Sequence, residues 1–258
     1  MTFDGLLLDI DGVLAVSWEA LPGAVEALVR LRDEKVPYRL ITNTTTKSRA
    51  DLAATLRDAG FDVADDEIVT AVVATAEHVR TAHPRASVFV LSDGDARADL
   101  VGIDLVDVDD ADVIVIGGAC DDFTYDTMNR IFRRLMDGAA LVGMHRNLYW
   151  KTAEGWELDG GAYLAGLEEA AETRAAICGK PEKTYFDAGL AMLGVGADRA
   201  AMVGDDIVND ILGAQAAGLT GILVRTGKYR AGDEARDDGR PDHVLESFAD
   251  VPAFVGSP

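Results

Sequence analysis

Short apolar runs alternate with stretches of helical periodicity along this 258-residue chain, and this alternation limits the possible folds more than any other feature. Phe3–Ile10 has the character of a short buried strand. Pro22-Gly23 then opens a segment in which Val25, Leu28 and Leu31 recur at helical spacing. Strands that alternate with helices form a parallel sheet covered by crossover helices. The pattern therefore predicts an α/β fold.

The same alternation continues through the rest of the chain. The predicted strands are Tyr38–Thr42, Ile68–Thr70, Val88–Leu91, Val113–Ile116, Leu141–Met144, Ala175–Gly179, Ala200–Gly204 and Gly221–Arg225. The predicted helices are Lys47–Ala59, Ala71–Thr81, Tyr125–Met136, Tyr163–Thr173, Glu182–Leu193 and Asn209–Ala217. Gly227–Asp242 is rich in charge, glycine and proline and is predicted to be a mobile surface loop.

Composition disfavours several classes of protein. A net charge of −21 repels nucleic acid phosphates, so no nucleic acid partner is expected. Apolar runs such as Val113–Ile116 are too short to cross a membrane. Cys120 and Cys178 are far apart in sequence and suggest neither a disulfide framework nor a zinc site. With no basic residue before Arg30, no secretory signal is predicted, and we expect a cytoplasmic location.

The acidic surplus has two interpretations. Forty-five acidic residues stand against 24 basic ones, and only six of the basic residues are lysines. High solubility alone is one explanation. The other, which we favour, is halophilic adaptation to molar salt, where the Debye length falls to about 3 Å and self-repulsion is screened.

Polar clusters follow four of the predicted strands. Ligands of open parallel sheets bind beyond the carboxyl ends of the strands, so the clusters are expected to meet at one site. Taken singly, each has an ordinary explanation, such as a helix N-cap for Asp205 or a solvated surface for Lys180. The clusters are Asp9-Ile10-Asp11-Gly12, Thr42-Asn43-Thr44, Gly179-Lys180-Pro181 and Gly204-Asp205-Asp206, with Asp210 one helical turn further on.

Asp9 and Asp11 are the most informative pair among these residues. Two carboxylates placed so closely raise each other's pKa unless a cation or a proton lies between them. The pair therefore indicates a magnesium site that also contains a nucleophile. Together with Thr42, Lys180 and Asp205 it resembles the four ordered motifs of the haloacid dehalogenase-like hydrolase superfamily.

Spacing refines this resemblance. Thr42 and Lys180 are separated by 137 residues, far more than one crossover needs. An insertion with its own α/β pattern is similar to the type C2 cap of subclass IIA, which includes nitrophenyl-phosphatase-like enzymes. The resemblance implies a Rossmann-like core over residues 1–80 and 178–258 and a C2-type cap over residues 81–177. Within the subclass, the segments Ile41–Thr45, Gly179–Thr184 and Arg225–Arg230 are most similar to the phospholysine phosphohistidine inorganic pyrophosphate phosphatases.

The resemblance implies a magnesium-dependent phosphatase. Asp9 would attack phosphorus to form an aspartyl phosphate. Asp11 would protonate the leaving oxygen and then activate water. Thr42, with the Asn43 amide, would hold a phosphoryl oxygen, and Lys180 would neutralise charge between the nucleophile and the phosphate.

The resemblance also implies how Mg²⁺ is held. Its ligands would be the Asp9 and Asp205 carboxylates and the Asp11 backbone carbonyl. Asp210, and with less support Asp206, would act behind these ligands, either through water or by orienting Lys180.

The cap is expected to set specificity and to be the surface of any homodimer. Asp159-Gly160-Gly161 is a candidate substrate-facing loop, with Gly160 close to the ligand because glycine lets backbone approach. Further candidates are His145, Arg146, Asn147 and Tyr149. An equally good explanation is that Tyr149, Trp150 and Trp156 only pack the cap or line a dimer interface.

Several alternatives remain open at this point. A phosphoamide or pyrophosphate hydrolase would use the same groups. A hydrolytic dehalogenase needs neither Asp11 nor Asp205, so both residues disfavour it. A phosphomutase usually has a different cap placement, and a receiver domain is only about half this length. A nicotinamide enzyme is disfavoured because the first strand is not followed by Gly-x-Gly-x-x-Gly. The substrate is expected to be a small phosphorylated metabolite, which the sequence does not identify.

Overall fold

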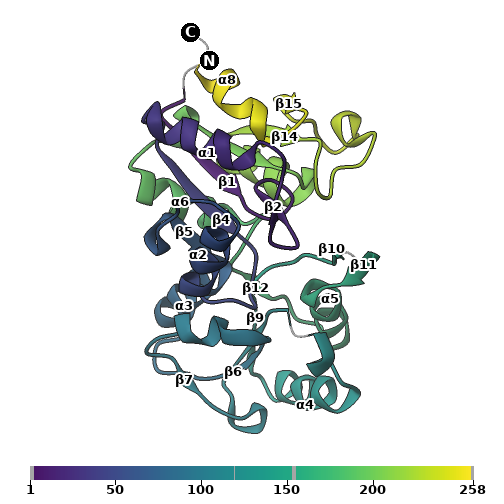
Figure 1. Ribbon diagram of the computed structural model, residues 1–258. Coiled ribbons are helices and arrows are strands. Elements are labelled where there is room, and N and C mark those ends of the chain that lie inside the picture. Colours follow the sequence, from purple (N-terminus) through teal and green to yellow (C-terminus); the bar gives the residue numbers. More distant parts are fainter. Residues whose placement is uncertain (1–2, 119, 153–154, 257–258) are drawn as a thin grey trace.

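The chain folds into two lobes, each built around its own sheet (Figure 1). This computed structural model describes residues 3–118, 120–152 and 155–256. The first lobe contains a six-stranded parallel sheet in the order β15-β14-β13-β1-β4-β5. Its strands are β1 (Gly5–Asp9), β4 (Tyr38–Thr42), β5 (Ile68–Thr70), β13 (Ala200–Gly204), β14 (Thr220–Val224) and β15 (His243–Leu245). The predicted α/β class is confirmed.

Helices cover both faces of the first sheet because β1 is apolar on both sides. Leu6 and Leu8 pack with α1 (Ala24–Asp33), α2 (Arg49–Asp58) and α8 (Val251–Val255). Leu7 points to the other face, where it packs with α6 (Lys183–Leu193) and α7 (Gly213–Ala217). A π-helical segment, Ile207–Leu212, precedes α7, so the predicted helix Asn209–Ala217 is not uniformly α-helical.

The second lobe is built on a five-stranded parallel sheet in the order β12-β9-β8-β6-β7. Helix α3 (Ala71–Ala82) covers one face, and α4 (Tyr125–Met136) and α5 (Gly160–Ala170) cover the other. All strands of this sheet lie between residues 87 and 177. They are β6 (Ser87–Leu91), β7 (Asp104–Leu105), β8 (Val113–Ile116), β9 (Ala140–Gly143) and β12 (Ala176–Ile177).

Some elements differ from those expected. The predicted strand Ala175–Gly179 is reduced to β12, which pairs with β9 in the second sheet. Strand β15 was not predicted. Neither were two hairpins, β2 (Ala15–Val16) with β3 (Glu19–Ala20), and β10 (Tyr149–Thr152) with β11 (Gly155–Leu158). Both hairpins are short antiparallel pairs, which the search for helix-connected parallel strands overlooks.

The segment predicted to be a mobile loop, Gly227–Asp242, is tied to the first lobe. Glu234 accepts hydrogen bonds from the Arg225 guanidinium and the Tyr229 hydroxyl, at 2.8 and 2.9 Å. Gln215 donates a hydrogen bond to the Asp242 carboxylate at 2.8 Å. In the part of the chain that the structure describes, no helix is long and apolar enough to cross a membrane.

Candidate active site

The four polar clusters meet at the carboxyl ends of the first sheet, where a cavity of about 160 Å³ opens toward the second lobe. Strands β1, β4 and β13 deliver Asp9, Thr42 and Asp205 to this edge, and Lys180 arrives from the segment that returns from the second lobe. Residues of both lobes line the cavity, including Asp9, Asp11, Thr42, Asn43, His145, Asn147, Gly160, Lys180, Asp206, Asp210 and Lys228.

Asp9, Lys180 and Asp210 form a buried chain of charges. The Lys180 Nζ lies 2.7 Å from Asp9 Oδ1 and 2.7 Å from Asp210 Oδ1. The backbone amide of Ile10 also donates a hydrogen bond to Asp9 Oδ1, at 2.8 Å, so the orientation of this carboxylate is fixed. Burial acts to lower the pKa of Lys180, but the charges of Asp210 and Asp9 outweigh it and raise that pKa. Lys180 is therefore held charged beside Asp9.

Asp205 lies in a space that only glycine leaves open. A Cβ on Gly12, which has φ +83°, would lie 1.9 Å from Asp205 Oδ2, and one on Gly227 would lie equally close. Asp205 Oδ2 accepts a hydrogen bond from the Lys228 backbone amide at 2.6 Å. Two glycines with positive φ thus let two loops close around one buried carboxylate.

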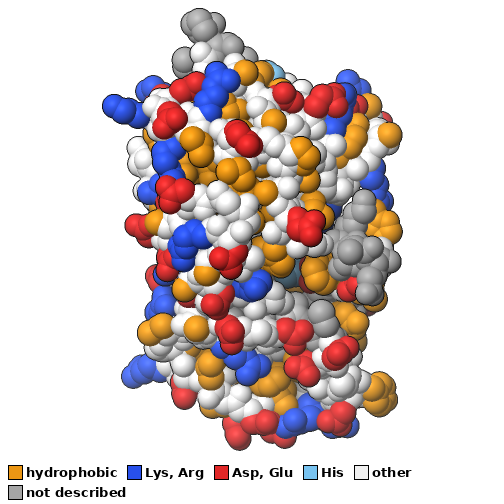
Figure 2. Space-filling model, in the orientation of Figure 1, with side chains coloured by type: hydrophobic (Ala, Val, Ile, Leu, Met, Phe, Trp, Pro, Cys, Tyr) orange, Lys and Arg blue, Asp and Glu red, His pale blue; other side chains and the backbone are white. Residues whose placement is uncertain are grey.

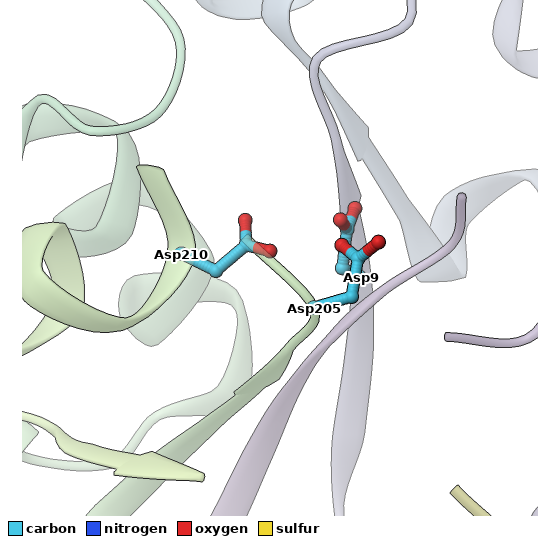
Figure 3. Close-up of side chains that lie close together, drawn as sticks. All are labelled: Asp9, Asp205 and Asp210. Atoms are coloured by element: carbon cyan, nitrogen blue, oxygen red, sulfur yellow. The ribbon is translucent and has the colours of Figure 1, made fainter. Parts of the chain in front are cut away.

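Three of these carboxylates form a group suited to a hard cation (Figure 3). One oxygen each from Asp9, Asp205 and Asp210 lies within 4.8 Å of the others. Burial and nearby negative charge raise the pKa of Asp205 and of Asp210. A divalent cation would offset the repulsion among these carboxylates and so lower their pKa values. Carboxylate oxygens are also the ligands that Mg²⁺ prefers. The residues present therefore fit the predicted magnesium ion.

Asp210 and Asp206 differ in their partners. Asp210 contacts Lys180 through Oδ1 and accepts the Asp206 amide through Oδ2 at 3.1 Å. Asp206 caps the following helical segment, because its Oδ1 accepts hydrogen bonds from the amides of Val208 and Asn209, both at 3.0 Å. The helix cap considered for Asp205 in the sequence is thus supplied by Asp206.

Thr42 and Asn43 are fixed by residues of the neighbouring helix and loop. The Tyr185 hydroxyl accepts from the Thr42 amide at 3.1 Å and lies 2.8 Å from the Thr42 carbonyl. The Asn43 side chain accepts from the Lys180 amide at 2.9 Å and donates to the Lys180 carbonyl at 3.0 Å. Asn43 therefore holds the backbone of Lys180 at the site. A Cβ on Gly179 would lie 2.5 Å from Asn43 Oδ1, so this loop also requires glycine.

Asp11 lies at the solvent-exposed side of the cavity and is not part of the three-carboxylate group. Part of the Asp11 side chain is exposed to solvent, but its carboxyl lies among the residues that line the cavity. This partial loss of hydration raises its pKa, against the opposing charges of Lys228 and Lys180. An acid with a raised pKa at the cavity mouth is suited to exchanging a proton with a ligand.

Lys228 is a site residue that the sequence reasoning missed. Its Nζ lies 3.6 Å from Asp206 Oδ2, and it lines the cavity. Burial acts to lower its pKa, but the charges of Asp206, Asp205 and Asp210 outweigh it and raise that pKa. The signal was present, because Thr226-Gly227-Lys228 is a fifth polar cluster that follows a strand, β14.

The second lobe contributes the opposite wall of the cavity. Gly160, at the first turn of α5, lines it and packs against the Gly117 carbonyl, which lies 2.1 Å from where a Cβ would be. His145 Nε2 lies 3.6 Å from Asp159 Oδ1, and burial lowers the His145 pKa. Asn147 Oδ1 accepts from Asn43 at 3.3 Å and so joins the two lobes.

The remaining predicted cap residues have other positions. Arg146 forms a two-pronged ion pair with the buried Glu168, at 2.7 and 2.8 Å, and does not line the cavity. Trp150 lines the cavity, whereas Tyr149 packs edge-on against Trp156 at 5.4 Å. Trp18 of the β2–β3 turn and Phe123 line the cavity as well and were not predicted.

Known proteins have sequences similar to this chain over nearly its whole length. The sequence pattern of the haloacid dehalogenase-like hydrolases matches residues 6–105, and a pattern described as HAD-hydrolase-like matches residues 177–251. The chain is 41% identical to haloacid dehalogenase-like hydrolase domain-containing protein 2 of Bos taurus, over 94% of this chain and 92% of that protein. It is 36% identical to the phospholysine phosphohistidine inorganic pyrophosphate phosphatase of Rattus norvegicus, over 96% and 92%.

A solved structure agrees with these sequence relationships. The p-nitrophenyl phosphatase from Archaeoglobus fulgidus superimposes with a TM-score of 0.91 at 27% identity, over 98% of this chain and 100% of that one. The similarity thus extends over both lobes. The chain belongs to the haloacid dehalogenase-like hydrolases.

Proposed function

We propose that this protein is a magnesium-dependent phosphatase that hydrolyses a small phosphorylated metabolite through an aspartyl phosphate on Asp9. One observation carries the proposal: Asp9, Asp205 and Asp210 gather within 4.8 Å of one another beside Lys180, at the edge of a cavity. The names of two similar proteins, a pyrophosphate phosphatase and a p-nitrophenyl phosphatase, support the phosphatase activity.

The residues of the chain have separate tasks in this mechanism. An Asp9 oxygen attacks phosphorus while the bond from phosphorus to the leaving oxygen breaks, and Asp11 donates its proton to that oxygen. Asp11 then accepts a proton from a water molecule whose oxygen attacks the phosphorus. The Asp9–phosphorus bond breaks, and inorganic phosphate leaves. The raised pKa of Asp11 supports its carrying a proton in the first step.

Charge control is the task of the surrounding groups. Lys180 contacts Asp9 directly and reduces the repulsion between this carboxylate and an incoming phosphate. Thr42 lines the same cavity and offers a hydroxyl to a phosphoryl oxygen. Mg²⁺, held by Asp9, Asp205 and the Asp11 carbonyl, would supply further positive charge to the transferring group.

Asp210 serves a supporting task in the proposal. Both of its oxygens already contact protein groups, the Lys180 ammonium and the Asp206 amide. It therefore orients Lys180 and adds negative charge behind the metal ligands. Asp206, as helix cap and partner of Lys228, supports the same loop.

A comparison of the wild type with Asp9→Asn tests the proposal. Phosphate release would be measured with Mg²⁺ and with EDTA, on p-nitrophenyl phosphate, a set of phosphorylated metabolites, pyrophosphate and a phosphoamide. Asp9→Asn should release no phosphate, while Asp58→Asn, a change of an exposed residue on α2, should behave as wild type. Phosphatase activity retained by Asp9→Asn would refute the role of Asp9 as nucleophile. Activity in EDTA equal to that in Mg²⁺ would refute the dependence on a metal ion.

A further inference from the structure

Hairpin β10–β11 forms part of the cavity wall opposite the catalytic carboxylates. Trp150 on β10 and Leu158 on β11 both line the cavity. Figure 1 shows the hairpin beside the boundary between the lobes, where it extends from the second lobe. The position of this hairpin therefore decides where the wall lies relative to Asp9.

One arginine of the first lobe contacts the aromatic side chains of this hairpin. The Arg230 guanidinium carbon lies 5.2 Å from the ring centre of Tyr149 and 4.8 Å from that of Trp156. The two rings pack edge to face, with centres 5.4 Å apart and planes at 88°. A planar guanidinium is attracted to aromatic faces, both electrostatically and by stacking on the ring. We call these three side chains the aromatic clamp.

The segment that carries Arg230 is also held by contacts outside the clamp. The Arg230 amide donates to the Asp233 carboxylate at 2.7 Å, and Tyr229 is tied to Glu234 at 2.9 Å. Lys228, two residues earlier, contacts Asp206 with its side chain and Asp205 with its backbone amide. A single turn thus connects the charge cluster of the site with the cavity wall of the other lobe.

Other contacts hold the second lobe at the loop that follows β4. The Gly118 amide donates to Thr45 Oγ1 at 2.8 Å, and Asn43 contacts Asn147 at 3.3 Å. Arg230 follows β14, which lies on the opposite side of β1 in the sheet order. The clamp therefore fixes the second lobe on a second side of the nucleophile, where the hairpin lines the cavity.

We propose that Arg230 is a positioning residue that determines specificity: through Tyr149 and Trp156 it holds hairpin β10–β11 so that Trp150 and Leu158 contact the leaving group. This inference rests on the proposed phosphatase activity. A substrate with a large leaving group needs the wall in place, whereas a small phosphoryl donor contacts only the catalytic groups. Loss of the clamp should therefore weaken the binding of large substrates selectively.

Steady-state kinetics of Arg230→Gln test this role. With p-nitrophenyl phosphate, KM should rise about three- to tenfold while kcat changes less than about twofold, and with acetyl phosphate neither should change. Arg230→Lys keeps a cation over the rings and should restore most of the wild-type KM. Arg236→Gln, which removes an arginine paired with Asp238 in the same loop, is the matched control and should behave as wild type. Equal KM changes for both substrates, or none, would overturn the proposal.

A second measurement does not depend on activity. In a Trp18→Phe/Trp150→Phe background, the remaining tryptophan, Trp156, reports the clamp by its fluorescence. Adding Arg230→Gln should increase acrylamide quenching by roughly twofold, because the guanidinium no longer covers the ring. If the wild type is inactive but quenching responds in this way, the proposed phosphatase activity is refuted and the contact of Arg230 with Trp156 is supported. An active enzyme whose quenching is unchanged would refute the clamp alone.

Discussion

The Lys180 ammonium and the Asp9 carboxylate are in direct contact at 2.7 Å, and these side chains are only 3% and 10% exposed. A buried ion pair is costly to desolvate, so it contributes less to folding than its short distance suggests. Here the lysine serves two carboxylates at once, because Asp210 lies at the same distance. The arrangement prepares charge for a ligand more than it stabilises the fold.

Replacing Lys180 with Met should destabilise the protein by about 3 kcal/mol, because it leaves the buried carboxylates without their lysine. The phosphatase activity proposed above should also fall by at least about 10²-fold. Urea unfolding followed by circular dichroism measures the first effect and phosphate release the second.

Mg²⁺ provides the control for this variant. Because a cation bound only by the folded state stabilises it, 10 mM Mg²⁺ should recover part of the stability that Lys180→Met loses. Lys183→Met, at an exposed i,i+4 pair with Asp187, should cost less than about 0.5 kcal/mol. Equal costs for Lys180→Met and Lys183→Met would contradict the importance of the buried pair.

Gly12→Ala should damage the site through collision as well as backbone strain. The new Cβ would lie 1.9 Å from Asp205 Oδ2 and would displace that carboxylate. We expect a loss of about 2–4 kcal/mol in stability and of most Mg²⁺ affinity, measured by urea unfolding and by calorimetric titration.

Gly138→Ala separates the two effects of that substitution. Gly138 has a similar φ of +99°, but a Cβ there would meet no atom within 4 Å. Its cost should be that of backbone strain alone, about 1 kcal/mol, with Mg²⁺ affinity unchanged. If both variants bind Mg²⁺ equally well, the close packing of Gly12 on Asp205 is not functionally important.

Much of the fold was predictable because strands of parallel sheets are continuous apolar runs. β1, β4, β8 and β13 were all located within about two residues for this reason. β15 was missed because His243–Leu245 is short and only half-buried, whereas β5, equally short and also at an edge, is a fully buried run. The hairpins were missed because their pairing is local and their aromatic residues are equally typical of packing surfaces.

The candidate site was predictable where residues follow strands directly. Asp9, Thr42 and Asp205 lie at strand ends, and sheet geometry alone brings them together. Lys228 was missed because the charge-rich segment around it is typical of a solvated loop. The aromatic clamp joins residues 149 and 230, and such a contact between lobes leaves no local pattern in the sequence.

The Cys178 thiol should be unreactive in the folded protein. Burial raises its pKa to about 11, so at pH 8 almost none of it is the reactive thiolate. Because the folded pKa lies above the ordinary value of 9.0, the contribution of this group to stability is complete below pH 9 and is lost as the pH rises toward 11.

In a Cys120→Ser variant, Ellman's reagent at pH 8 should modify the folded protein at least about 100 times more slowly than the urea-unfolded protein. A fast reaction in the folded state would show that the thiol is accessible.

The stability of the protein should increase with salt concentration. Figure 2 shows acidic side chains spread over the visible face, and the net charge of −21 makes their mutual repulsion the dominant long-range term. Between 0.1 and 2 M KCl the Debye length falls from about 10 Å to below 3 Å, which screens this repulsion more than it weakens short ion pairs. We expect a gain of about 2 kcal/mol, or roughly 4–8 °C in Tm, measured by circular dichroism.

Sucrose, which is excluded from the protein surface but carries no charge, is the control for effects other than screening. Full structure and an unchanged Tm in salt-free buffer would refute halophilic adaptation and leave solubility as the explanation of the acidic surface.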